Sequence, residues 1–162
     1  MMKNKKVLGG GAVLFAAAFW FYIKPNYIDS STPPVYTEEQ ISEAPRPTVN
    51  LEERVLNLKS PAIAPNYVKV QIALEFADPD HDWIGLEGEG LVTANEAFTE
   101  HLEGEIHRIW DVVSSVVGEK SLDDVATTAG REELKVELRT AINREIHDQQ
   151  VENVFFVTFV TQ

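Results

Sequence analysis

One stretch near the N-terminus is long and apolar enough to cross a membrane. Residues 7–23 read VLGGGAVLFAAAFWFYI and contain no charged side chain and no proline. A helix of this length spans about 25 Å at ~1.5 Å per residue, slightly less than a hydrocarbon core of ~30 Å. The flanking Lys6 and Lys24 can reach the headgroups from either end and make up the difference. The sequence therefore predicts a single transmembrane helix over residues 7–23.

The charges beside this helix predict its orientation. Residues 1–6 contain three lysines, whereas no Lys or Arg occurs between Lys24 and Arg46. Because positive charge is retained in the cytoplasm, we expect residues 1–6 to form a cytoplasmic tail. Trp20 and Tyr22 lie at the exit end, where aromatic residues anchor a helix in the membrane interface. A cleaved signal peptide is the alternative, but it needs a small-residue cleavage site, and aromatics followed by Lys-Pro-Asn do not supply one.

Small residues gather on one face of the predicted transmembrane helix. Gly9, Ala12 and Ala16 are spaced i, i+3 and i+7, so another helix could approach closely along that face. Ordinary use of Gly and Ala in membrane helices explains the same pattern, and the sequence leaves both interpretations open. No ionisable side chain lies within the span, so the helix has no ion path of its own.

The segment after the anchor has the composition of a tether. Residues 24–50 contain five of the eight prolines, with Ser, Thr and Glu between them and no apolar periodicity. Proline-rich chains extend by up to ~3.1 Å per residue and behave as semi-rigid spacers. We therefore predict a linker over residues 24–50 and one extracytoplasmic domain over residues 51–162.

The charge and the missing cysteines exclude several classes of function. The chain has 26 acidic and 14 basic residues, and its net charge is −12. Nucleic acid and anionic lipid headgroups are therefore not expected as partners. Because there is no cysteine, the chain has no disulfide, no thiolate metal site and no cysteine nucleophile.

Candidate metal and catalytic groups in the outer domain lack the patterns that such sites need. Asp78, Asp80 and Asp82 alternate as in a calcium loop, but the required sixth-position glycine is replaced by Trp83. A solvated acidic loop is the preferred interpretation. His101 and His107 are six residues apart and cannot chelate one metal from one helix.

The serines give the same result. Ser114 and Ser115 lie in an apolar helical stretch, with no G-x-S-x-G turn and no histidine placed beside them. We therefore predict no enzymatic activity, no cofactor and no metal.

The outer domain has both strand and helix periodicity. Residues 67–76, YVKVQIALEF, alternate strictly and predict a strand with one buried face, while residues 151–162 are apolar on both faces in the middle. Short strand character also occurs over residues 53–59. These patterns predict an α+β domain in which a small mixed sheet packs against helices. The residues expected to form its core are Val70, Ile72, Leu74, Trp110, Leu134, Leu138, Phe155 and Phe159.

Two helices are expected between the long strands. Thr93 and Glu96 form a capping-box pattern, which places the start of a long helix there and its end at Gly118. A second amphipathic helix is expected over residues 131–147. The acidic, glycine-containing residues up to Val92 are expected to form a mobile loop.

Four stretches of the outer domain are distinctive beside the anchor-and-tether layout. They are VLNL (55–58), YVKVQIALEF (67–76), SLDDVATTAGREELKVELRTAIN (121–143) and VENVFFVTFVTQ (151–162). Through this layout and these stretches the chain resembles the flagellar basal-body-associated protein FliL family. The acidic segment 77–104 departs from the family pattern, in which a shorter connection is usual.

The resemblance implies a non-enzymatic accessory of the bacterial flagellar motor in the cytoplasmic membrane. It implies an extracytoplasmic domain of the stomatin-like fold that self-associates, in a ring, around or beside the stator complex and supports torque generation. A membrane-tethered domain that binds a ligand as a sensor is the alternative, and it would require a substantial cavity.

Overall fold

A computed structural model describes residues 34–162. The predicted cytoplasmic tail, the predicted transmembrane helix and the first part of the predicted linker lie outside the described residues. The proposed anchor residues and the small-residue face of Gly9, Ala12 and Ala16 are therefore predictions from sequence alone. Within residues 34–162, no helix has the length and apolar character needed to cross a membrane.

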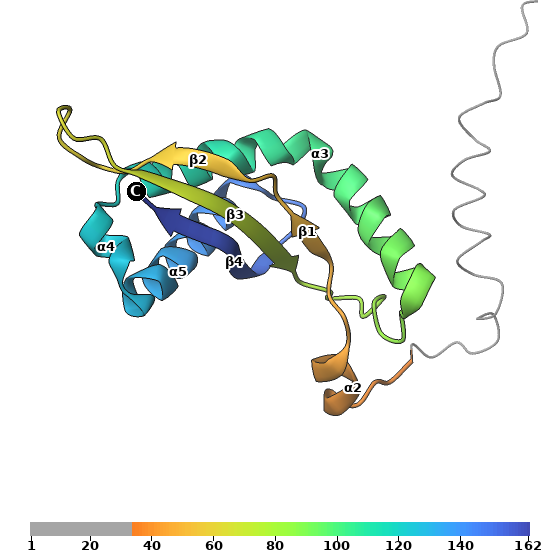
Figure 1. Ribbon diagram of the computed structural model, residues 1–162. Helices are drawn as coiled ribbons and strands as arrows, with labels where there is room; N and C mark the ends of the chain where they lie inside the picture. Colours follow the sequence, from red (N-terminus) through yellow and green to blue (C-terminus); the bar gives the residue numbers. More distant parts are fainter. Residues whose placement is uncertain (1–33) are drawn as a thin grey trace, which may run out of the picture. The chain divides into compact units, whose positions relative to one another are not determined.

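A four-stranded antiparallel sheet forms the centre of the domain (Figure 1). The central strand β3, Tyr67–Phe76, pairs along one side with β4, Val151–Thr161. On its other side, β1, Thr48–Asn50, pairs with the end of β3, and β2, Arg54–Asn57, pairs with its beginning.

The predicted α+β class is therefore confirmed, but the sheet is antiparallel rather than mixed. The short connection from β2 to β3 returns the chain beside the strand that it has just left, and this forces antiparallel pairing. The three helices between β3 and β4 bring the chain back to the end of β3 where they began, with Val151 opposite Phe76.

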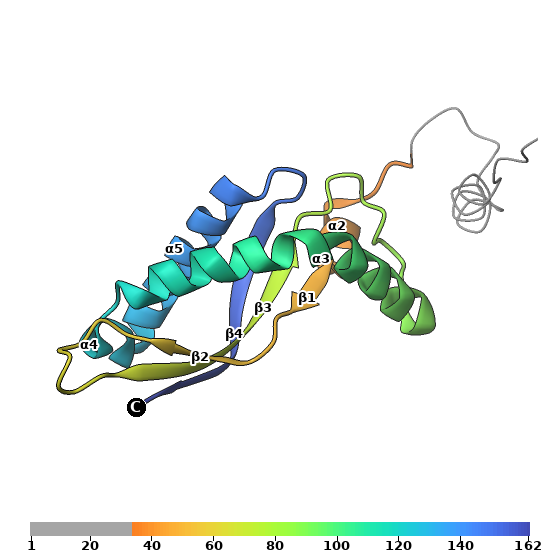
Figure 2. The same cartoon turned by 90° about the horizontal axis from the view of Figure 1, so that it is seen from above.

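The helices cover one face of this sheet (Figure 2). They are α3, Gly88–Gly118, α4, Leu122–Ala126, and α5, Thr128–Glu145. A further short helix, α2, Glu38–Glu43, precedes β1 and begins with a capping box in which Gln40 N donates to Thr37 Oγ1. Alternate side chains of β3, from Val68 to Phe76, pack under α3 and α5 and are fully buried.

Seven of the residues predicted for the core lie within or against it, and one does not. The fully or almost fully buried ones are Val70, Ile72, Leu74, Trp110, Leu134 and Leu138. Phe159 is partly buried and packs against the cluster. The core assignment of Phe155 is wrong, because this side chain is 46% exposed. It lies opposite Ala73, on the face of the sheet that no helix covers.

The predicted start of the long helix is also wrong. Helix α3 begins at Gly88, so that Thr93 lies inside it as an exposed residue. The tertiary contacts at this end of the helix lie beyond Thr93, where Asn95 Oδ1 accepts a hydrogen bond from Thr48 N at 3.0 Å. Phe98 contacts Phe76 edge to face, with ring centroids 5.1 Å apart. Glycine in a helix costs only about 1 kcal/mol per residue relative to alanine, so Gly88 and Gly90 do not prevent the helix from starting here.

The sheet extends into the segment that was predicted as linker. Strand β1 lies within residues 24–50, and its Thr48 pairs with Glu75 of β3. Val49 is buried in the core, as is Leu51 directly after the strand. The neighbouring prolines suggested a tether, but two buried apolar side chains are enough to attach this short segment to the domain.

Candidate functional site

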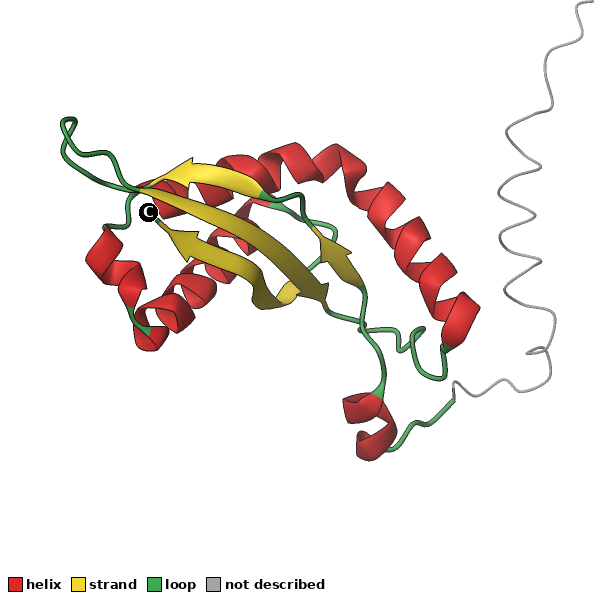
Figure 3. Ribbon diagram, viewed as in Figure 1, coloured by secondary structure: helices red, strands yellow, loops and turns green. Residues whose placement is uncertain are grey.

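The face of the sheet opposite the helices is uncovered in the described domain (Figure 3). The β3 residues on this side are Tyr67, Lys69, Gln71 and Ala73, of which Ala73 is buried; the residues that alternate with them lie beneath the helices. Large apolar side chains from the two flanking strands are exposed there by between 46% and 65%: Val55, Phe155, Val157 and Val160. We call the surface formed by these residues the open face. Apolar side chains concentrated on one surface are typical of a protein contact site.

An irregularity in β4 contributes to this exposure. Thr158 lies opposite Gln71 and Phe156 lies opposite Ile72, so Val157 has no partner residue on β3 and forms a bulge. A bulge directs a side chain out of the regular alternation. Val157 is 58% exposed as a result, although it lies in the most apolar part of the strand.

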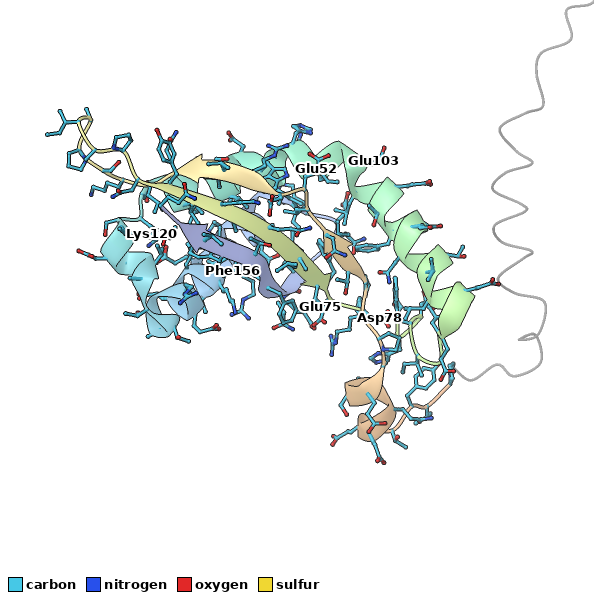
Figure 4. All side chains as sticks on the ribbon, viewed as in Figure 1. Glu52, Glu75, Asp78, Glu103, Lys120 and Phe156 are labelled. Carbon is cyan, nitrogen blue, oxygen red and sulfur yellow. The ribbon has the colours of Figure 1, made fainter. Side chains whose placement is uncertain are left out.

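Two polar pairs lie among the apolar side chains of the open face. Lys69 Nζ lies 2.8 Å from Glu53 Oε1. Asn153 Nδ2 donates to Glu75 Oε1 at 2.7 Å (Figure 4 labels Glu75). Lys69 lies between Val55 and Val160 on the neighbouring strands, and Gln71 lies opposite Thr158. The open face therefore mixes apolar and polar side chains along its length.

Strand β4 is also the edge of the sheet. At its first residues, side chains of α5 bind the backbone groups of this edge. Asn143 exchanges two hydrogen bonds with the backbone of Val151, and Arg139 donates to Glu152 O. Beyond Glu152, within residues 34–162, β4 pairs with β3 and with no second strand. An edge of this length offers unpaired backbone groups to a partner.

The acidic loop after β3 is organised by its own backbone. The two carboxylate oxygens of Asp78 accept hydrogen bonds from Asp82 N at 3.1 Å and Trp83 N at 3.0 Å. Across the described part of the chain, no group of three or more His, Cys, Asp or Glu side chains is arranged to hold a metal. Through its two hydrogen bonds, Asp78 holds the backbone of this loop in place. Trp83 is buried beside Phe98, with ring centroids 6.2 Å apart.

The other polar candidates are placed as the helix pattern predicts. His101 and His107 are exposed on α3. Ser114 Oγ donates to the carbonyl oxygen of Trp110 within the same helix, at 2.7 Å. Its hydroxyl thus makes a helix contact and is not hydrogen-bonded to a base.

A groove of about 360 Å³ lies at the end of the domain where β3 ends. Its apolar lining comes from α2 and its C-terminal flank and from the loop after β3, and includes Ile41, Ala44, Pro45, Pro79 and Ile84. Arg46 and Glu152 form an ion pair in its wall. No feature of the sequence predicted this groove, because its walls come from three segments that the fold brings together.

Comparison with known proteins identifies relatives of this chain. Residues 48–162 match the family described as flagellar basal body-associated protein FliL. A flagellar protein FliL from Aquifex aeolicus is 28% identical over 110 residues, which cover 64% of this chain and 68% of the relative. A flagellar protein FliL from Bacillus subtilis is 26% identical over 125 residues, which cover 77% of this chain and 74% of the relative.

Proposed function

Since the chain belongs to the FliL family of flagellar basal body-associated proteins, we propose that it supports the stator complex of the motor by binding it. The family match is the main support for this proposal, because it covers the whole sheet and all three helices behind it. A flagellar motor accessory role follows from the family. The stator as partner, self-association and placement in the cytoplasmic membrane are the proposed additions.

The proposed mechanism is selective binding. A partner with equal affinity for two states of a stator does not change the equilibrium between them. The chain therefore has to bind the torque-generating state more tightly than the other state. The predicted transmembrane helix and the start of the linker are held closest to a neighbouring membrane protein. The open face is the contact surface that the described domain offers, and we propose that part of the stator complex covers it.

A double substitution tests the role of the open face. Phe155→Thr with Val157→Thr removes two exposed apolar side chains and places threonine, a β-branched residue suited to a strand, at both positions. We expect thermal unfolding to change little and swimming to be strongly reduced. Val136→Thr is the matched control, because Val136 is 53% exposed on helix α5 and should tolerate the change. Wild-type swimming in the double variant, or loss of self-association instead of stator binding, would contradict the assignment of this face to the stator.

A second set of substitutions tests the predicted transmembrane helix. Changing Gly9, Ala12 and Ala16 to Leu fills the face along which another helix could approach. Motility under load should weaken, while the outer domain stays folded and self-associates as before. Normal torque in this triple variant would show that the stator contact lies elsewhere.

A ligand-binding sensor remains the second candidate, and the groove is the observation in its favour. Its 360 Å³ lies near the lower end of the ~300–1,000 Å³ typical of small-molecule sites. The accessory role has the stronger support, because it accounts for both the family match and the open face.

A further inference from the structure

The outer side of strand β4 is occupied only where the strand begins. There the side chain of Asn143 accepts a hydrogen bond from Val151 N and donates one to Val151 O. Beyond Glu152, no side chain within residues 34–162 forms a hydrogen bond with the β4 backbone. An incoming strand could make along this edge the kind of bonds that Asn143 makes at Val151.

The pairing with β3 determines which backbone groups of β4 point outward. Tyr67 and Gln162 exchange two backbone hydrogen bonds, each of 2.9 Å. Because the direction of these groups alternates along an antiparallel strand, Thr161 and Phe159 direct their N–H and C=O groups away from β3. The register is regular from there back to the bulge at Val157. This stretch therefore offers the backbone groups of two residues to a partner strand.

Helix α5 places cationic side chains along the same strand (Figure 2). Arg131, Lys135 and Arg139 are spaced four residues apart, so they lie on one face of the helix. The guanidinium of Arg131 lies 5.9 Å from the ring centroid of Phe159. The ammonium of Lys135 lies 5.6 Å from the ring centroid of Phe156. Since Arg139 donates to the backbone near the start of β4, the three cations follow the strand along its length.

Two of these cations can still bind a carboxylate. Among residues 34–162, Arg131 has no ion pair, and its side chain makes one hydrogen bond, from Nε to Thr127 O at 3.4 Å. Lys135 is paired with Glu132 at 2.7 Å, but a surface pair of this kind contributes only about 0.3–0.5 kcal/mol, and an ammonium has three donors. The net charge of the chain is −12, so the attraction for a carboxylate is confined to these cations.

An extended segment paired with this stretch would direct its side chains to two different surfaces. A residue directly opposite Phe159 faces the helices, as Phe159 itself does, and approaches Arg131. The residues on either side of it face the other side of the sheet, beside the exposed Val160. The edge therefore suits a segment in which acidic side chains alternate with apolar ones.

We propose that β4 binds an extended segment of a partner protein, with acidic side chains facing Arg131 and Lys135 and apolar side chains facing Val160. A second copy of this chain fits less well. Pairing two β4 strands edge to edge would bring the cations of both α5 helices together on one face, and like charges repel. The added strand would lie beside β4 and would not cover the sheet, so the proposal does not depend on the stator binding the open face.

The peptide Glu-Val-Glu-Val-Glu-Val is the probe, and the same peptide with lysine in place of glutamate is its control. Fluorescence anisotropy would measure their binding to the full-length protein in detergent at physiological ionic strength. The acidic peptide should bind, and Arg131→Gln with Lys135→Gln should weaken its binding by about tenfold. Arg108→Gln with Arg144→Gln removes the same charge away from this edge and should change binding by about twofold or less. Equal binding of both peptides, or no binding of the acidic one, would overturn the proposal.

Amide hydrogen exchange, measured by nuclear magnetic resonance on the full-length protein, tests the strand pairing itself. The acidic peptide should slow exchange at Phe159 and Thr161 and leave it unchanged at Val160, whose N–H already faces β3. Peptide binding without protection of the two outward amides would show a charge contact alone and contradict the proposal. Protection of both amides without peptide, rising with protein concentration, would assign the edge to a second copy.

A proline variant provides an independent measurement of the same pairing. Thr161→Pro removes an outward N–H but breaks no bond to β3, and proline is tolerated in edge strands at such positions. Thermal unfolding should stay close to that of the wild type, while binding of the acidic peptide should weaken by about fivefold or more. Unchanged peptide binding in this variant would rule out pairing along Thr158–Thr161.

Discussion

Leu138→Asp is expected to unfold the domain formed by residues 37–162. Leu138 lies on α5 beneath the sheet and is fully buried. An ionised carboxylate without a partner in such a position costs several kcal/mol, and the lost packing of leucine adds about 2–5 kcal/mol. Small domains have a total stability of only about 5–15 kcal/mol.

Val136→Asp is the matched control for this change. It introduces the same side chain two residues away on the same helix, at a position that is 53% exposed. We expect its effect to stay within about 0.5 kcal/mol. Circular dichroism of the full-length protein in detergent during heating would measure the thermal unfolding of both variants. Similar unfolding curves for the two variants would show that the apolar stripe of α5 does not face the core.

Gly130→Ala should destabilise the domain, by about 1–3 kcal/mol, because the site has no room for a methyl group. A Cβ at this position would lie 1.9 Å from the carbonyl oxygen of Asp124 and 3.0 Å from its carbonyl carbon. Both are backbone atoms, so no side-chain rotation can relieve the clash. Helix α4 and the start of α5 would have to separate.

Gly104→Ala makes the same chemical change, but it is expected to increase the stability of the domain. Gly104 lies inside α3, and a Cβ there would meet nothing within 4 Å. Replacing a glycine in a helix interior by alanine should stabilise the protein by about 0.5–1 kcal/mol. Denaturant unfolding would compare the two variants. A stabilised Gly130→Ala variant would mean that α4 and α5 are not packed closely at this point.

Side-chain periodicity was sufficient to predict the central elements of the fold. The alternation from Tyr67 to Phe76 predicted β3 with its buried face, and the helical spacing of Leu134 and Leu138 predicted α5 and its core contacts. The last strand also followed from its apolar residues. Local pattern is informative for β3 and α5 because each of these two elements buries one regular face.

The errors occur where distant contacts decide the structure. The glycines near Gly88 suggested a loop, yet α3 begins at Gly88, and β1 and Phe76 contact it further along, at Asn95 and Phe98. Phe155 was assigned to the core because apolar residues lie on both sides of β4, and sequence does not show that helices cover one face only.

The candidate site was the least predictable part. The open face followed from the sequence only as the side of β3 opposite its predicted buried face, and the bulge that exposes Val157 depends on the pairing with β3. The groove depends on three separate segments meeting at one end of the sheet. No local pattern in the sequence encodes either feature.

The torque of single motors under high load most directly tests whether this chain supports the stator. It would be measured in a strain that lacks the chain, with and without re-expression of the wild-type protein, and flagella would be counted in each case. We predict lower torque in the deletion strain, an unchanged number of flagella, and full recovery on re-expression. Wild-type torque at every load in the deletion strain would contradict the proposed function.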